Sequence, residues 1–413
     1  MERTELARLL QGTAERHLLN DVSEGAPVVV CERDPVRFMA AFSEAVAGTG
    51  SVFLADPNWG AAERAVLDEL VRSAICPPPS ALRQAWLAVP TGGSSGSVRF
   101  ARHDQDTIAA AVGGFTRHFG VERVNAVGLL PLHHVSGLMG WMRCALTGGA
   151  YRPWIWDDLL SGQRPALEPG DWFLSLVPTQ LQRLLGSPSA VDWLRRFRVI
   201  SVGGGPVWPE LADAAAQARL PVSLGYGLTE TMAMVAAQLP EEFAGGDRSA
   251  GRMMPHAGIA IDAEGVVTIT GDSVFHGYWP EENPSRCLVT SDAGNIDASG
   301  RLHLLGRRDA VIITGGKKVQ PEEVEAALRA TGLFPDVVVI GVPDPEWGEA
   351  VVACHPAGAA PLDPAKIPGL LSALAPFKRP KRYVGLPDWP RNAQGKVNRA
   401  ALRETVLISK SLG

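Results

Sequence analysis

The chain has 413 residues, of which 46% are hydrophobic and 20% are charged, and its formal net charge is −5. This composition excludes a mainly disordered or fibrous protein, and the mildly acidic balance gives no sign of a nucleic-acid or anionic-membrane partner. The length predicts two to three domains.

Cysteine usage and the apolar segments predict a cytoplasmic protein. The five cysteines are widely spaced, with no CxxC pair and no His/Cys cluster at metal-ligand spacing, so reduced thiols are expected. The N-terminus carries acids and lacks a long apolar core, which argues against a secretory signal. The most apolar window, residues 124–146, is interrupted by Asn125, Pro131 and Arg143, which a lipid-spanning helix would not tolerate together. We therefore expect small-molecule partners, no nucleic acid and no membrane insertion.

The first 90 residues show α/β patterning. Helical periodicity covers residues 5–19, 35–47 and 61–74, and short apolar runs at 28–30 and 52–54 predict strands.

The next 150 residues or so alternate strand and helix patterns. Buried-looking strands are predicted at 126–130, 172–177, 198–202 and 222–224, with helical stretches between them. Ligands of such sheets bind beyond the carboxyl ends of the strands.

After residue 251 the pattern changes to short strands separated by turn signals. Turns are predicted at 262–265, 292–294 and 297–300, which indicates a β-rich lobe. We place a domain boundary near Gly306, giving an N-terminal domain over 1–306 and a C-terminal domain over 307–413.

The C-terminal domain is predicted to be small and α+β. A strand is expected at 337–342, with helices opening at 321, around 367–374 and from 399. The predicted fold class is therefore α/β, with crossover sheets and a β-rich lobe followed by this smaller domain.

A glycine- and hydroxyl-rich stretch at residues 91–96 (T-G-G-S-S-G) suits an anion. Small residues let backbone N–H groups turn inward and hydroxyls add donors, which fits a phosphate chain, and Arg99 adds positive charge. The Walker A pattern fails because Gly96 is followed by Ser97 and Val98 rather than by Lys and Ser/Thr. Taken alone, such a stretch is more often a flexible connection.

Six further segments combine glycine or a hydroxyl residue with polar side chains. Singly, each is best explained as a turn or as solvated surface charge, but their joint order is uncommon. They are residues 201–206 (S-V-G-G-G-P), 224–230 (L-G-Y-G-L-T-E), 290–292 (T-S-D), 306–309 (G-R-R-D), 314–318 (T-G-G-K-K) and 394–397 (Q-G-K-V).

This order resembles the adenylate-forming superfamily, which includes acyl-CoA and aryl-CoA synthetases, adenylation domains of peptide synthetases and firefly luciferase. The resemblance runs from about residue 89 to residue 402. Residues 91–99 resemble its T-S-G-T-T-G-x-x-K phosphate loop, with Arg99 in place of lysine, a change that alters hydrogen-bond geometry. The residues implied to hold the phosphates are Thr91, Gly92, Gly93, Ser94, Ser95, Gly96 and Arg99.

The resemblance also assigns the other nucleotide-site residues. Lys396 takes the place of the adenylation lysine, and Asp309 takes the place of the hinge residue. Thr229 corresponds to a phosphate ligand and Glu230 to a Mg²⁺ ligand. The implied adenine and ribose residues are Gly203, Gly204, Gly205, Pro206, Gly225, Tyr226, Asp292 and Arg307, with Ser291 where the family has glycine before the aspartate. The candidates for CoA contact are Gly315, Gly316 and Lys317.

Residues 130–138 (L-P-L-H-H-V-S-G-L) match the family's P-L-x-H segment, which borders the acyl pocket. This form particularly resembles the o-succinylbenzoyl-CoA synthetases of menaquinone and phylloquinone biosynthesis. Their acid has two carboxylates, and only the succinyl carboxylate is activated. The other carboxylate needs a cation to pair with it inside the pocket, because an unpaired buried charge is costly. Arg143 is the candidate for this cation. From the residues alone, a loop histidine pair and a surface arginine are equally good interpretations. The implied pocket residues are His134, Ser136, Gly137, Arg143 and Gly227.

The implied activity is that of an ATP-dependent acid–CoA ligase with Mg²⁺ as cofactor and ATP and CoA as co-substrates. A mobile C-terminal domain would deliver Lys396 for adenylate formation and then swing to admit the thiol. The alternatives are a ligase for another aryl or fatty acid, an enzyme that loads a carrier protein, and a nucleotide-binding homologue without catalysis. The last is disfavoured because Lys396 and Glu230 are both present.

Overall fold

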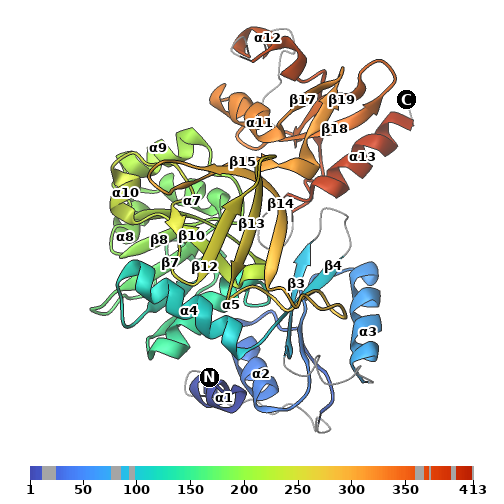
Figure 1. The fold of residues 1–413 in the computed structure, drawn as a ribbon. Coiled ribbons are helices and arrows are strands. Elements are labelled where there is room, and N and C mark those ends of the chain that lie inside the picture. The colour runs from blue at the N-terminus through green and yellow to red at the C-terminus, as the bar shows by residue number, and fades with distance from the viewer. Residues whose placement is uncertain are drawn as a thin grey trace.

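The computed structural model describes residues 1–11, 25–75, 85–92, 98–358, 367–371, 374–391 and 397–411. Within these ranges the strands form four sheets. Three of the sheets belong to a large body that contains the N-terminus, and the fourth belongs to a smaller C-terminal part beside it (Figure 1).

The first sheet has the order β1-β2-β3-β4, and its last pair is antiparallel. Its strands are β1 (Val28–Val30), β2 (Val52–Leu54), β3 (Leu87–Gly92) and β4 (Val98–His103), and the helices of this region are α1 (Arg3–Gln11), α2 (Pro35–Ala47) and α3 (Ala61–Ile75). Helix α2 begins at a proline, and the Asp34 carboxylate caps it by accepting from the Arg37 N–H. The expected strands at 28–30 and 52–54 are confirmed. The first helix begins at Arg3, and residues 12–19 of the expected helix lie outside the described ranges.

The second sheet has seven strands in the order β11-β10-β9-β8-β7-β5-β6, of which β6, β5, β7, β8 and β9 run parallel. The strands are β5 (Asn125–Gly128), β6 (Tyr151–Pro153), β7 (Trp172–Leu176), β8 (Val199–Val202), β9 (Val222–Leu228), β10 (Ala233–Ala237) and β11 (Arg252–Met253). The connecting helices are α4 (Gln105–Phe119), α5 (Val135–Thr147), α6 (Trp156–Leu160), α7 (Pro178–Leu185), α8 (Pro188–Leu194), α9 (Pro209–Gln217) and α10 (Pro240–Ala244). Strand β9 is longer than expected, because Gly225 to Leu228 continue it by pairing with β10.

The third sheet is an antiparallel set, β12 (Ala257–Ile261), β13 (Val266–Gly271), β14 (Cys287–Ile296) and β15 (Leu302–Arg307). The prediction of a turn at 292–294 was wrong, since these residues lie inside β14. Asp292 pairs with Arg307 and Ala293 pairs with Gly306, and the register then shifts at Gly294. A β-bulge at this point thus allows the Asp-Ala-Gly sequence, which is typical of turns, to lie within a continuous strand.

The C-terminal part is built on the fourth sheet, whose order is β17-β16-β19-β18 with β20 beside β19. Its elements are β16 (Ile312–Thr314), β17 (Lys317–Val319), α11 (Pro321–Ala330), β18 (Val338–Asp344), β19 (Gly348–Pro356), α12 (Ile367–Leu370), β20 (Arg382–Leu386) and α13 (Arg399–Ser411). The helix expected around 367–374 ends earlier, at Leu370, and residues 372–373 lie outside the described ranges. This part buries a core of its own around Val324, Phe334 and Val351.

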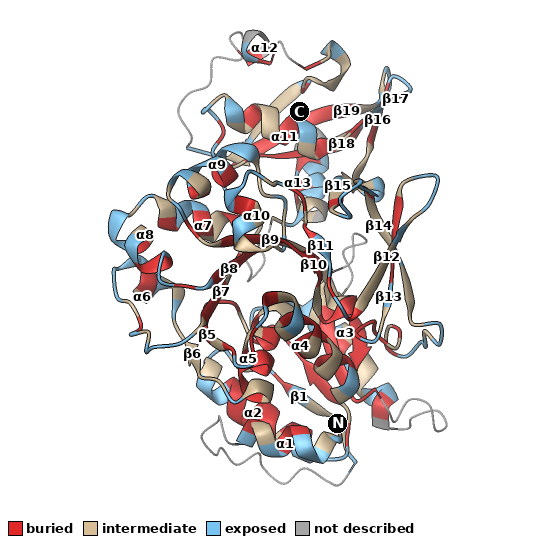
Figure 2. Cartoon of the chain, turned by 60° about the vertical axis from the view of Figure 1, so that its left-hand side comes forward, coloured by how far each residue is buried: buried red, intermediate tan, exposed pale blue. Residues whose placement is uncertain are grey.

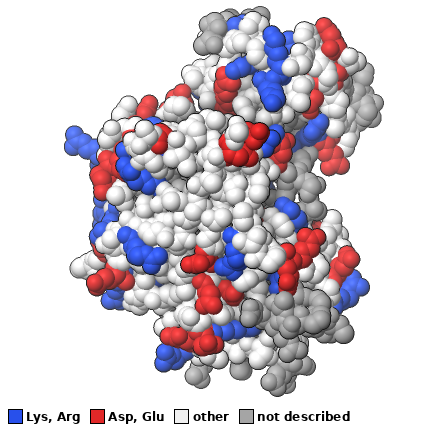
Figure 3. Space-filling model, viewed as in Figure 1, with Lys and Arg blue, Asp and Glu red and all other residues white. Residues whose placement is uncertain are grey.

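Buried residues concentrate on the strands and on the inward faces of the helices in the large body (Figure 2). One cluster joins the first sheet to α5 through Phe42, Trp86 and Trp141. On the face seen in Figure 3, basic and acidic side chains are interspersed. None of the helices in the described ranges combines the length and apolar character needed to span a bilayer.

The cysteines within the described ranges carry free thiols, and Cys76 lies outside them. The free thiols are Cys31, Cys144, Cys287 and Cys354.

Candidate active site

Three predicted nucleotide-site residues meet between the second and third sheets. Tyr226 on β9 donates its hydroxyl hydrogen to Asp292 Oδ2 at 2.6 Å. Arg307 on β15 stands opposite Asp292 in the strand register, with its Nη1 3.9 Å from Asp292 Oδ1. Arg307 also donates from Nε and Nη2 to the two carboxylate oxygens of Asp309, at 2.8 and 2.5 Å. The predicted ribose residues and the predicted hinge residue are therefore directly connected.

The surroundings keep Tyr226 protonated and Arg307 charged. Burial raises the pKa of Tyr226, and the charge of Asp292 raises it further, so the phenol remains a donor. The hydrogen bond to Asp309 raises the pKa of Arg307. The Asp292 carboxylate thus accepts from one neutral donor and faces one cation, with lone pairs left for further donors. Tyr226 lies within β9 rather than in a turn.

Tyr278, which was not among the predicted residues, contacts two residues that were, Glu230 and Arg99. Its hydroxyl donates to Glu230 Oε1 at 2.7 Å, and the Arg99 guanidinium lies 3.9 Å from the centre of its ring. Burial and the Glu230 carboxylate raise the pKa of Tyr278. Glu230 is itself only 7% exposed and follows β9 in a short 3₁₀ turn, Thr229–Thr231. The feature of the sequence that could have indicated Tyr278 is the rarity of tyrosine. The chain has four tyrosines, and three of them lie in this region or in the pocket described below.

The predicted adenine-side glycines gather at the carboxyl end of β8. Gly203 begins the loop that leaves β8, and a Cβ on Gly203 would lie 3.5 Å from the carbonyl oxygen of Gly225 on the neighbouring strand. Gly204 has φ +77°, a conformation that strongly favours glycine. Pro206 ends this turn before α9. The missing side chains leave backbone exposed at the edge where ligands of parallel sheets bind.

The predicted phosphate loop is described only at its two ends. Thr91 and Gly92 lie at the end of β3, and Thr91 pairs with Arg99 on β4. The remaining predicted residues of this loop, Gly93, Ser94, Ser95 and Gly96, lie outside the described ranges, as does Lys396.

The predicted CoA residues lie in the C-terminal part. Gly315 and Gly316 form the turn between β16 and β17, and the Lys317 Nζ lies 4.6 Å from the centre of the Phe377 ring. Within the described residues, no hydrogen bond or ion pair joins them to Asp292 or Glu230.

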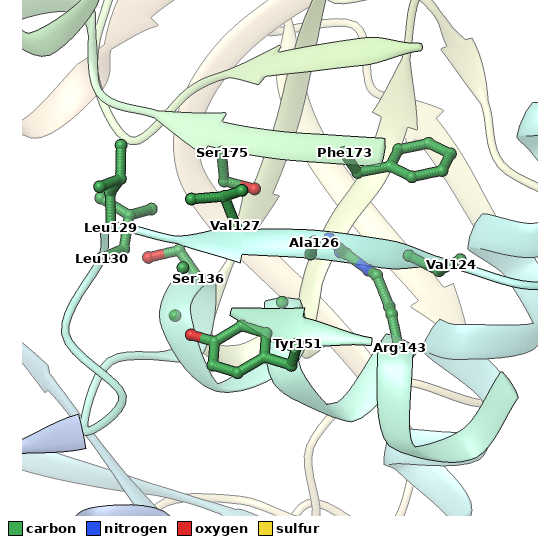
Figure 4. A pocket seen from close by; sticks show the side chains of 13 residues that line it. Val124, Ala126, Val127, Leu129, Leu130, Ser136, Arg143, Tyr151, Phe173 and Ser175 are labelled. Carbon is green, nitrogen blue, oxygen red and sulfur yellow. The ribbon is translucent and has the colours of Figure 1, made fainter. Parts of the chain in front are cut away.

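A small pocket with a cavity volume of about 20 Å³ lies between β5 and α5. Ser136, Gly137 and Arg143, all predicted for the acyl pocket, line it, together with Tyr151 and Ser175. The close-up shows the Arg143 side chain running from α5 towards β5 (Figure 4).

Gly137 permits the tight packing of this helix, because a Cβ there would lie 2.2 Å from the Pro131 carbonyl oxygen. Two other predicted pocket residues, His134 and Gly227, are not among the lining residues. A Cβ on Gly227 would lie 1.9 Å from the carbonyl oxygen of Ala233, so glycine there serves the close β9–β10 turn.

Arg143 is buried rather than on the surface, with a relative exposure of 6%. Its guanidinium lies 4.0 Å from the centre of the Phe115 ring, and its Nε has no hydrogen-bond partner. No carboxylate lies within ion-pair distance of it among the described residues. Burial lowers the pKa of Arg143 to about 10, so the side chain is still charged at neutral pH. The pocket therefore contains a buried cation without an anionic partner in the described part of the protein.

His134 precedes the first turn of α5 and is half-buried. Burial lowers the pKa of His134 to about 3, so the imidazole is neutral at pH 7. Its neighbour His133 turns towards the first sheet, with its Nε2 3.6 Å from Asp56 Oδ2.

Comparisons with known proteins agree on one family. The profile of the "AMP-binding enzyme" family matches residues 12–279, and that of the "AMP-binding enzyme C-terminal domain" matches residues 323–396. The 2-succinylbenzoate–CoA ligase of Enterococcus faecalis is 29% identical over 336 residues, covering 77% of this chain and 69% of that one. The indoleacetate–CoA ligase of Aromatoleum aromaticum is 30% identical over 429 residues, covering 96% and 82%.

The fold agrees with a solved relative. The o-succinylbenzoate CoA synthetase of Bacillus subtilis, in complex with its acyl-adenylate intermediate, superimposes with a TM-score of 0.78 at 20% identity, covering 97% of this chain and 91% of that one. The α/β fold class expected from the sequence is confirmed. The chain belongs to the family of AMP-binding, adenylate-forming enzymes.

Proposed function

We propose that this chain is an ATP-dependent, AMP-forming acid–CoA ligase and that its acid is 2-succinylbenzoate. Several relatives carry the name 2-succinylbenzoate–CoA ligase, including one of Salmonella typhimurium at 33% identity. The names of the relatives alone do not settle the acid, because an indoleacetate–CoA ligase aligns over more of the chain.

The observation that carries the choice of acid is the buried Arg143. A cation removed from water is costly unless an anion pairs with it, and no carboxylate of the described residues does so. A substrate with a carboxylate on its aromatic ring, in addition to the one that is activated, would supply that anion inside the pocket. Indoleacetate has only the carboxylate to be activated and would leave Arg143 unpaired.

The nucleotide roles are proposed for the residues that the structure brings together. Asp292 would accept from the ribose hydroxyls, with Tyr226 and Arg307 orienting it, and the glycines around Gly203 would border the adenine. Glu230 suits Mg²⁺, because its carboxylate supplies the hard oxygen donors that this ion prefers, and Tyr278 occupies only one of the two oxygens. When bound, Mg²⁺ would offset charge on the ATP phosphates.

The reaction would proceed in two halves. The acid carboxylate attacks the α-phosphorus of ATP, the bond to the β-phosphate oxygen breaks, and pyrophosphate leaves. The CoA thiol then loses its proton and attacks the acyl carbonyl, and AMP leaves. We propose that residues 307–413 move as the second domain about Asp309, that Lys396 stabilises the first transition state, and that Gly315 to Lys317 lie near CoA in the second half.

The activity test supplies ATP, Mg²⁺ and CoA with a panel of acids and measures AMP and thioester. Thioester is expected with 2-succinylbenzoate at a kcat/KM well above those for indoleacetate, benzoate and octanoate. Turnover of any of these three with none of 2-succinylbenzoate would contradict the choice of acid. Adenylate formation with transfer only to a carrier protein's phosphopantetheine arm would contradict the CoA ligase.

Asp292→Asn is expected to raise the KM for ATP about 10- to 100-fold, since hydrogen bonds to a charged group are worth about 1.5–3 kcal/mol. Tyr226→Phe should have a smaller effect in the same direction, because it removes one orienting donor and leaves the carboxylate in place. The measurement is initial-rate kinetics with ATP and acid varied separately. Asp297→Asn, in the exposed turn after β14, is the matched control. A parallel rise in the KM for the acid would show that the sheet, not the ribose contact, had been disturbed.

A further inference from the structure

A cluster of three metal-ligating side chains lies outside the proposed nucleotide site. Asp56, in the loop after β2, and the adjacent His133 and His134, just before α5, each offer one ligand atom, and these atoms all lie within 4.8 Å of one another. Asp56 and His133 are 7% and 5% exposed, whereas His134 is half-buried. The cluster is therefore largely enclosed, and the Nε2 atoms of both histidines lie inside it.

Two nitrogens of this cluster make no hydrogen bond, although one of them lies 3.6 Å from the Asp56 carboxylate. The Nε2 atoms of His133 and His134 are both buried without a hydrogen bond. The Asp56 carboxylate is oriented by the N–H of Asn58, which donates to Oδ1 at 2.8 Å, so that Oδ2 faces His133. Buried polar atoms are normally satisfied, and two unsatisfied imidazole nitrogens beside one carboxylate oxygen point to a missing shared partner.

The spacing suits a transition-metal ion. With ligand bonds of about 2.1 Å, neighbouring ligand atoms around a tetrahedral Zn²⁺ lie about 3.4 Å apart. The observed separation between His133 Nε2 and Asp56 Oδ2 is 3.6 Å. Two imidazoles and one carboxylate are a ligand set for Zn²⁺ and neighbouring first-row ions, whereas Mg²⁺ prefers oxygen ligands and retains its waters.

We propose that Asp56, His133 and His134 form a binding site for a divalent transition-metal ion of the zinc class, with water completing the coordination. The site joins the loop after β2 of the first sheet to the start of α5. A bound ion would therefore clamp two parts of the large body together. The inference rests on this cluster alone and is independent of the proposed ligase activity.

The test uses the full chain without a polyhistidine tag, stripped with a chelator and titrated with Co²⁺ and Zn²⁺. We expect one equivalent of Co²⁺ to bind with visible d–d absorption, Zn²⁺ to displace it, and millimolar Mg²⁺ to leave it in place. Zn²⁺ should also raise the midpoint of thermal unfolding, because it binds only the folded arrangement.

His133→Asn and Asp56→Asn should each weaken Co²⁺ binding by more than about 100-fold, since even indirect partners of metal ligands account for 10- to 100-fold. His303→Asn is the matched control, because His303 also pairs with an aspartate, Asp297, at 3.0 Å but has no second histidine beside it. Thermal unfolding without metal verifies that each variant is folded, and His133→Gln serves if the asparagine variant is not. Absence of Co²⁺ and Zn²⁺ binding, or equal affinity in the parent chain and both ligand variants, would overturn the proposal.

Discussion

Replacing Arg143 with methionine is expected to lower kcat/KM for 2-succinylbenzoate by on the order of 100- to 5,000-fold. Methionine keeps much of the buried volume but removes the charge, so the ring carboxylate would enter the pocket without a counter-ion. Breaking a buried ion pair in this way costs about 3–5 kcal/mol. The loss should fall mainly on the KM for the acid, leaving the KM for ATP unchanged, and initial-rate kinetics with each substrate varied would measure it.

The second acid needed for this test is the analogue that lacks the ring carboxylate. Arg143→Met should use the analogue as well as the parent enzyme does, or better, whereas Arg143→Lys should partly restore use of 2-succinylbenzoate because lysine keeps the charge but not the geometry. Arg117→Met, on the exposed side of α4, is the matched control. If both acids lose activity equally in Arg143→Met, then Arg143 acts through packing on Phe115 and the choice of acid loses its main support.

Lys396→Ala is expected to reduce adenylate formation by on the order of 100- to 1,000-fold, the usual effect of removing one group that stabilises transition-state charge. The second half-reaction should survive, because no pentacovalent phosphorus forms when the thiol attacks a preformed adenylate. Pyrophosphate release from ATP measures the first half. Thioester formation from supplied acyl-adenylate and CoA measures the second.

Lys378→Ala is the control for this experiment, since Lys378 lies in the same C-terminal part and pairs with Glu323 at 2.6 Å. It should leave both half-reactions near the parent values. A Lys396→Ala variant that loses both half-reactions to the same extent would contradict a role confined to adenylate formation.

Contiguous features were predictable from the sequence. The strands at 28–30 and 52–54 and the helix at 35–47 follow from apolar runs and from a proline at the start of the helix, which are local causes. The segments around Gly203 and Tyr226 were likewise visible because each is a short motif.

Features that depend on how distant segments pack were not predictable. Tyr278 matters through Arg99 and Glu230, each of which comes from another part of the chain. Helical periodicity could not decide which way Arg143 faces, because α5 is covered on one side by the first sheet and on the other by the second. The prediction of a turn at 292–294 was wrong because it also depended on a distant segment. Pairing with β15 keeps these residues in a strand despite their turn-like composition.

Arg307 is shared between Asp292 and Asp309, and this sharing has a thermodynamic consequence. The guanidinium holds the proposed hinge residue with two hydrogen bonds while facing the proposed ribose acceptor across the strand pair. A ligand that draws the guanidinium towards Asp292 loosens its hold on Asp309, and a rotation of the backbone at Asp309 changes what Arg307 can offer the ligand. By linkage, the affinity of a ligand bound at Asp292 and the orientation of the backbone at the proposed hinge would then bias each other by the same free energy.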